Sequence, residues 1–251
     1  MRRTLTDPEA FVETSSPDIR TMRNLSGMTS RWKEALRSPS FRLQFLLTVP
    51  ILGILLFFYA HFLDWIELRP GVVLHDPLLA SFPARKVTWI VFSLIYGGLV
   101  LGLGTVGARP AALLVALQSY ALLVAARMAA MYFMPLDPPV GMIRLKDPFV
   151  QLFDPGVVLT KDLFFSGHVA TLFLLFLTAH HRVLRAVFLL ATVVVGAGLI
   201  WQHVHYTIDV LTAPFITFGC YRLVLMAHRG PETSWDCGEF ECLRRQPTGH
   251  P

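Results

Sequence analysis

The sequence is poor in charged residues. Only 16% of its 251 residues are Asp, Glu, Lys or Arg, whereas 54% are hydrophobic. Soluble domains usually carry about 25% charged residues. With a mean hydropathy of +0.54, the composition predicts that lipid, rather than water, surrounds most of the chain. At this length we expect one compact membrane bundle with short polar ends.

Cysteine is also rare. Cys220 lies in an apolar run, and Cys237 and Cys242 lie in the polar C-terminal region. The sequence has no C-x-x-C pair and no Cys/His quartet, which argues against a structural zinc site. We interpret the two tail cysteines as plain thiols, with lipid acylation as the less favoured alternative.

A cleavable signal peptide is not indicated, because residues 1–40 are polar and the first apolar run starts too late. The net charge of +5 and the pI near 9.4 are compatible with nucleic-acid binding. However, the cations mostly flank apolar runs, where membrane topology and anionic lipids explain them more simply. We therefore predict membrane lipid, and no nucleic acid, as a partner.

Long apolar runs dominate the rest of the sequence. A membrane-spanning helix needs about 20 mostly apolar residues, and six segments meet or approach that length. The six segments run from about 43–65, 88–106, 111–134, 163–179, 184–201 and 206–226. We predict an all-α membrane protein, a bundle of six transmembrane helices.

The domain organisation follows from these runs. We expect a polar cytoplasmic N-terminal segment at 1–40, a six-span domain at 41–228, and a polar, mostly disordered cytoplasmic tail at 229–251. Both termini are placed inside because the short loops 107–110 and 180–185 are basic, as cytoplasmic loops usually are. The longest loop, 135–161, then lies outside, and its prolines disfavour a regular helix.

Four polar residues fall within the apolar segments, where such groups are energetically costly and often functional. They are Arg127, His168, His205 and Asp209. His168 lies near the outer start of the fourth segment and His205 near the outer start of the sixth. Two membrane crossings separate them, so the chain returns to the same face. The two histidines are therefore predicted to share one outward-facing site.

The spacing of these residues suits phosphoryl chemistry. Asp209 follows His205 by four positions, so on a helix the carboxylate can orient the imidazole and leave one nitrogen as a nucleophile. His168 can protonate a leaving oxygen. Arg127 can neutralise phosphate oxygens. Ser166 and Gly167 suit a tight turn into a helix whose free N–H groups favour an anion.

Each of these residues also has a purely structural interpretation. A histidine near a membrane interface is commonly a simple interfacial residue. The His205–Asp209 pair can be a structural hydrogen bond, and Arg127 can extend toward the interface or pair with a carbonyl. His203 is interpreted as a bystander. The convergence of several costly groups on one face favours the functional interpretation.

These motifs resemble a known family. D-L-F-F-S-G-H at 162–168 and H-V-H-Y-T-I-D-V at 203–210 resemble two signatures of the sphingomyelin synthase-like branch of the lipid phosphate phosphatase superfamily (type 2 phosphatidic acid phosphatases). The segment from Tyr120 through Arg127 to Met142 resembles another signature of that family, more loosely. The resemblance covers roughly residues 41–228 and implies a lipid phosphate phosphatase-like bundle.

The resemblance implies a catalytic mechanism that needs no metal and no cofactor. His205 would form a phosphohistidine, Asp209 would orient it, and His168 would protonate the leaving diacylglycerol. Substrate-binding candidates are Arg127, Asp162 and Ser166. The partners would be a phospholipid donor, phosphatidylcholine or phosphatidylethanolamine, and a ceramide-like alcohol as acceptor. The expected location is a bacterial inner membrane or a secretory-pathway membrane, with the site on the non-cytosolic face.

The sequence also departs from that family. Lys161 replaces a usual glycine, Val169 replaces a common threonine, and residues 75–83 occupy the region of the first signature without matching it. A lipid phosphatase or phospholipase C-like hydrolase, with water as acceptor, is therefore the alternative. The third interpretation is a non-enzymatic transporter, scaffold or pseudoenzyme, which the intact triad disfavours.

Overall fold

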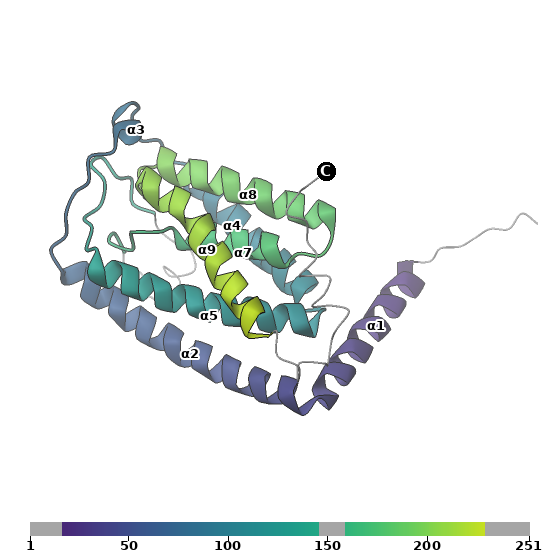
Figure 1. The fold of residues 1–251 in the computed structure, drawn as a ribbon. Coiled ribbons are helices and arrows are strands. Elements are labelled where there is room, and N and C mark those ends of the chain that lie inside the picture. Colours follow the sequence, from purple (N-terminus) through teal and green to yellow (C-terminus); the bar gives the residue numbers. More distant parts are fainter. Residues whose placement is uncertain (1–16, 146–158, 229–251) are drawn as a thin grey trace, which may run out of the picture.

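The computed structural model describes residues 17–145 and 159–228, which form helices joined by loops (Figure 1). The expected tail at 229–251 lies outside these residues, as do part of the N-terminal segment and part of the loop at 135–161. The helices are α1 (Pro17–Arg37), α2 (Pro39–Leu68), α3 (Pro77–Ala80), α4 (Thr88–Val106), α5 (Pro110–Phe133), α7 (Gly167–Thr178), α8 (Arg182–Trp201) and α9 (Thr207–Ala227).

Five of these helices, namely α2, α4, α5, α8 and α9, are long and apolar enough to cross a membrane. This finding indicates a multi-pass membrane protein. The fourth expected span, 163–179, is not among these five helices. It contains α7, which has only 12 residues and a length of about 18 Å, whereas the hydrocarbon core is about 30 Å thick.

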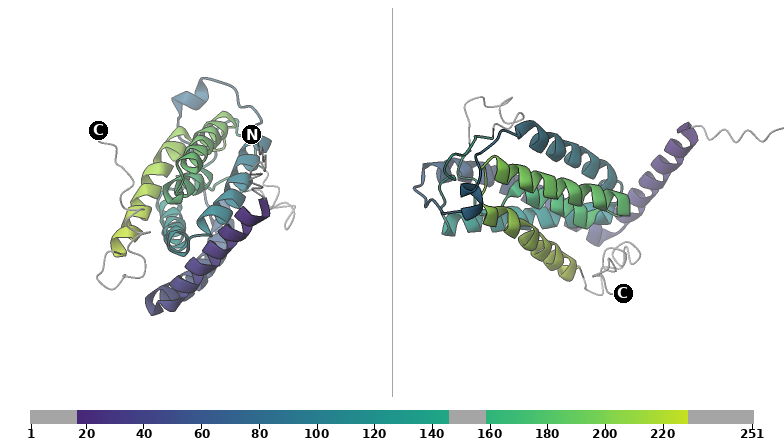
Figure 2. Two further views of the ribbon diagram at one scale, coloured as in Figure 1. Left: turned by 90° about the vertical axis from the view of Figure 1, so that its right-hand side faces the viewer. Right: turned by 90° about the horizontal axis from the view of Figure 1, so that it is seen from above.

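Helix α7 lies in the centre of the bundle, between α4, α5, α8 and α9 (Figures 1 and 2). Glycines allow α4 to approach it closely. A Cβ atom on Gly98 would lie 2.6 Å from the side chain of Leu172, and one on Gly102 would lie 2.6 Å from that of Leu175. Small residues at such helix contacts are common in membrane bundles. Helix α2 covers the bundle from the side of α5.

Several helix starts follow from local sequence. Proline occupies the first turn of α2, α3 and α5, where its missing N–H would have no helical partner anyway. Ser166 precedes α7, and its hydroxyl accepts from the amide of Val169. Asp76 precedes α3 and accepts from the amides of Leu78 and Leu79. These are the side chains that most often cap helices.

The loops at one end of the bundle, named the outer end after the predicted topology, are held together by Gln202, which is fully buried. Its side-chain oxygen accepts from the amide of Val87 at 3.1 Å, and its side-chain nitrogen donates to the carbonyl of Ile143 at 3.1 Å. Its backbone carbonyl also accepts from the amide of Ile143. One amide side chain thus joins the segments before α4, after α5 and after α8. These loops form a fixed rim at the outer end.

At the opposite end, α1 projects away from the bundle (Figure 1 and the right view of Figure 2). Ala35 packs in one buried cluster with Phe41 and Leu114, and the indole N–H of Trp32 donates to the carbonyl of Gly107 at 3.0 Å. The same ring packs edge-on against Phe41 and Phe45 of α2. The polar N-terminal segment therefore includes a helix that is anchored to the inner loop between α4 and α5.

Candidate active site

The candidate site lies inside the bundle because α7 is short. Helices α7 and α8 are joined by a short turn at the inner end, but α7 is eight residues shorter, or about 12 Å at 1.5 Å per residue. The loop that precedes α7 fills this space, and its Leu163, Phe165 and Ser166 are buried. Non-helical backbone at membrane depth is tolerated where protein surrounds it. His168, in the first turn of α7, is therefore recessed.

The structure brings the two histidines together. His168 and His205 line the same cavity, which has a volume of about 140 Å³ and also includes Asp162. The other lining residues are mostly apolar: Phe92, Met142, Leu145, Leu159, Thr160, Leu163 and Val204. His168 belongs to α7 and His205 to the segment just before α9. The two-crossing argument predicts this meeting of two distant parts of the chain. A group that enters this cavity can contact both imidazoles.

Asp209 orients His205. The carboxylate oxygen Oδ2 of Asp209 lies 3.3 Å from Nδ1 of His205 and accepts from the amide of Tyr206 at 3.2 Å. His205 is 2% exposed and Asp209 is fully buried. A carboxylate that accepts from Nδ1–H leaves Nε2 with a lone pair. This arrangement activates an imidazole in nucleophilic catalysis.

Ser166 links the two motifs. Its amide donates to the carbonyl of Asp209 at 3.1 Å, so the turn before α7 is joined to the first turn of α9. Its hydroxyl accepts from the amide of Val169 at 3.5 Å and thereby caps α7. Together, the two hydrogen bonds fix the position of His168 relative to His205. A direct role of Ser166 in substrate binding remains a prediction.

Arg127 holds the loop that leads to His168. Its Nε donates to the hydroxyl of Tyr59 at 2.8 Å, one terminal nitrogen donates to the carbonyl of Phe165, and the other pairs with the carboxylate of Asp162. Gly167 is required beside it, because a Cβ atom there would lie 2.8 Å from the guanidinium. Arg127 therefore fixes the loop, whether or not it also contacts a phosphate.

Asp162 is the charge partner of Arg127. Burial by itself raises the pKa of this carboxyl, but the nearby guanidinium, with smaller contributions from His205 and His168, lowers it below its usual value. The Tyr59 hydroxyl donates to the same carboxylate oxygen at 3.0 Å. Asp162 thus stays ionised at neutral pH. Because it compensates Arg127, a phosphate in the cavity would meet a cation that is already paired.

Both motif loops contain a residue in an unusual backbone conformation. Among the described residues, Phe164 (φ 94°) and His203 (φ 54°) are the only residues other than glycine with positive φ. Such conformations are uncommon for these residue types and tend to cluster at functional sites. His203, expected to be a bystander, is buried, and its Nδ1 lies 3.4 Å from the carbonyl of Val140.

The sequence-based reasoning missed several residues that position the site. Glu67, near the outer end of α2, accepts from the amides of Thr160 and Lys161 at 3.0 and 3.1 Å. Lys161 forms an ion pair with Asp137 at 2.9 Å, so this departure from the resembled family serves to tether the loop. Tyr59 was detectable in principle, because it is a polar group within the first apolar segment; Glu67 lies just beyond that segment.

Asp76 is another missed residue, and it caps α9 from a distance. Its carboxylate accepts from the amide of Thr207 at 2.7 Å and from the hydroxyl of Thr207 at 3.1 Å. Thr207 is two residues after His205. The same carboxylate caps α3. Asp76 therefore joins the loop before α4 to the helix that carries Asp209.

We expect Asp76→Ala to lower the free energy of unfolding by about 1–2 kcal/mol, since this is the usual cost of a lost helix cap. Turnover should fall as well, because the first turn of α9 would lose its anchor. Thermal unfolding in detergent and initial rates would measure the two effects. Asp64→Ala is the matched control, because Asp64 is exposed on α2. Equal behaviour of the two variants would contradict a capping role.

Comparison with known proteins adds one match. Residues 161–226 match the family described as PAP2 superfamily C-terminal. The matched segment contains His168, His205 and Asp209 and extends from the loop before α7 almost to the end of α9. No curated protein and no solved structure matches the chain. The match supports membership of the chain in the PAP2, or lipid phosphate phosphatase, superfamily.

Proposed function

We propose that the protein is an integral-membrane lipid head-group phosphotransferase that transfers a phospho-head group from a glycerophospholipid to a lipid alcohol such as ceramide. The observation that carries this proposal is the single cavity lined by His168 and His205, with Nδ1 of His205 held by Asp209. The PAP2 match supports phosphoester chemistry on lipids. Transfer of the sphingomyelin synthase type is the finer part of the proposal.

In the first step, Nε2 of His205 attacks the phosphorus of the donor. A P–N bond forms, and the bond between phosphorus and the diacylglycerol oxygen breaks. His168, in its protonated form, gives its proton to that oxygen, so diacylglycerol leaves as a neutral alcohol. Asp209 accepts a hydrogen bond from Nδ1–H and stabilises the charge that develops on the imidazole.

In the second step, the hydroxyl oxygen of the acceptor attacks the same phosphorus. His168, now neutral, takes the hydroxyl proton, the new P–O bond forms, and the P–N bond to His205 breaks. Both histidines return to their starting states. If water replaces the lipid alcohol, the same steps release a phosphorylated head group, and the enzyme is a hydrolase.

Burial of the site favours a lipid alcohol over water as acceptor. His205 is 2% exposed, and most residues that line its cavity are apolar. The exclusion of water from a reactive intermediate protects it from hydrolysis. Hydrolysis remains the alternative, because the three catalytic candidates are the same for both reactions.

The test uses purified protein in liposomes that contain phosphatidylcholine or phosphatidylethanolamine labelled in the head group, with and without ceramide. Transfer predicts a labelled sphingolipid only when ceramide is present. Hydrolysis predicts a labelled water-soluble phosphate ester in both samples. Chelator should leave either reaction unchanged. If the protein gives neither product, with donors of both head groups, the proposal is wrong.

A further inference from the structure

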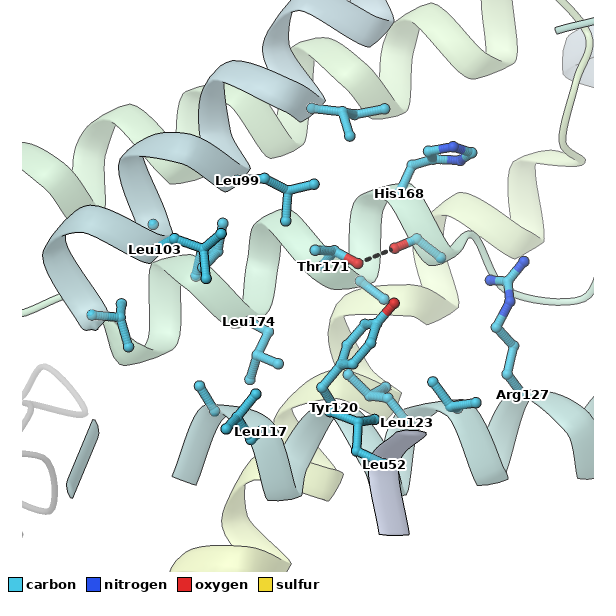
Figure 3. Close-up of a pocket in the computed structure, with 18 of the residues that line it drawn as sticks. Leu52, Leu99, Leu103, Leu117, Tyr120, Leu123, Arg127, His168, Thr171 and Leu174 are labelled. Carbon is cyan, nitrogen blue, oxygen red and sulfur yellow. Dashed lines mark hydrogen bonds between the residues drawn. The ribbon is translucent and has the colours of Figure 1, made fainter. Parts of the chain in front are cut away.

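A second, larger cavity begins where the candidate site ends. It has a volume of about 490 Å³ and lies between α2, α4, α5 and α7. Asp162 and His168 line both cavities, so the two are adjacent. Figure 3 shows His168 and Arg127 at one end and Leu103, Leu117 and Leu174 toward the other.

The larger cavity is long and runs parallel to the helices. On α5 it is lined by Leu113, Ala116, Leu117 and Tyr120, at the spacing that places residues on one face of a helix. From Leu113 to Arg127 it extends over about 21 Å at 1.5 Å per residue. This is about two-thirds of the thickness of a hydrocarbon core of about 30 Å. The cavity therefore reaches the inner half of the membrane.

The polarity of the cavity changes along its length. The outer end carries Arg127, Asp162 and His168, whereas the inner end is formed by Leu103, Val106 and Leu113. A phospholipid has the same polarity, with a phosphate at one end and a hydrocarbon chain that extends toward the centre of the bilayer. One chain of the donor lipid therefore fits both the direction and the lining of this cavity.

We propose that the larger cavity binds one hydrocarbon chain of the donor phospholipid and that the length of the cavity sets the chain length that the enzyme prefers. The inference rests on the proposed function, since it places the phosphate of the same lipid between His168 and His205. Longer chains bury more methylene groups until the inner end is reached. Beyond that length, additional methylene groups extend past the cavity and gain no further burial in it.

Ala116 is the position best suited to test this limit. It lines the inner half of the cavity and is half-buried on α5. Gly102 also lines the cavity, but a side chain there would displace Leu175 and disturb the contact between α4 and α7. Ala125, on the same helix, does not line the cavity and is exposed to lipid. It provides a control with the same starting residue.

The first experiment compares Ala116→Phe with Ala125→Phe, using dioleoyl and dioctanoyl donors in mixed micelles. Ala116→Phe should lower kcat/KM for the long-chain donor, relative to the short-chain donor, by roughly ten-fold, the order expected when about two methylene groups lose their burial. Ala125→Phe should leave this ratio unchanged. If both variants keep the wild-type ratio, the proposal is overturned.

The second experiment does not depend on turnover. A donor phospholipid with a diazirine at the end of one chain is crosslinked to the His205→Ala protein, and the labelled residues are mapped by mass spectrometry. Labelling at Leu113 or Ala116 supports the chain site, even if no reaction product is ever found. Labelling only at lipid-facing residues such as Leu122 and Ala125 overturns it.

Discussion

His205→Ala is expected to abolish both transfer and hydrolysis. The P–N bond cannot form without this imidazole, and loss of a nucleophile from a catalytic triad lowers turnover by roughly 10⁴-fold to 10⁶-fold. The bundle should remain folded, because His205 lines a cavity and Asp209 keeps its hydrogen bond from the amide of Tyr206. Initial rates with labelled donor, together with thermal unfolding in detergent, measure the two effects.

Two further variants make this result specific. Asp209→Asn should lower turnover by about 10³-fold to 10⁴-fold, since an amide can select the wrong tautomer of the imidazole. His203→Asn is the matched control, because it replaces a buried histidine in the same loop and asparagine tolerates positive φ. Reactions quenched in alkaline denaturant, which preserves a P–N bond, should contain head-group label on the wild-type protein and none on the His205→Ala protein. Wild-type turnover by the latter would refute the nucleophile assignment.

Arg127→Met is expected to destabilise the protein by about 3–5 kcal/mol, the usual cost of removing one partner of a buried ion pair. Asp162 would keep its charge without its partner, and the carbonyl of Phe165 would lose a donor. Turnover should fall with stability, because the loop that leads to His168 would lose its main anchor. The midpoint of thermal unfolding and kcat measure the two consequences.

A double variant separates positioning from phosphate binding. If Arg127 fixes the loop, Arg127→Met combined with Asp162→Leu should be less destabilised than Arg127→Met alone, because no unpaired carboxylate remains. Arg127→Lys should recover only part of the stability, since an ammonium group cannot reproduce the directional hydrogen bonds of a guanidinium. An unchanged unfolding midpoint with a raised KM would show instead that Arg127 acts on the substrate alone.

The sequence was sufficient to predict the parts of the fold that depend on local pattern. Apolar runs predicted the five membrane-length helices to within a few residues. Counting membrane crossings placed His168 and His205 on one face, and they do line one cavity. The spacing of four residues predicted the contact between His205 and Asp209. Each inference needed only periodicity or topology.

The remaining features depend on contacts between distant segments. Because Leu163, Phe164 and Phe165 are apolar, they were predicted to begin a span, but they belong to a loop inside the bundle. Arg127 was expected to bind phosphate or to pair with a carbonyl, but its ion pair with Asp162, 35 residues away, was not predicted. Asp76 caps a helix 131 residues later in the chain. No local pattern in one sequence specifies these pairings.

The recessed start of α7 has a consequence for the membrane around the protein. Trp65, Trp89 and Trp201 are exposed at the outer ends of three helices, the level at which tryptophan meets lipid head groups. A phosphate at His168 would lie deeper than this level, so the head group of the reacting lipid would have to move toward the centre of the bilayer. The distance of this movement would be shorter in a thin bilayer and longer in a thick one. Bilayer thickness then becomes a physical control on the rate.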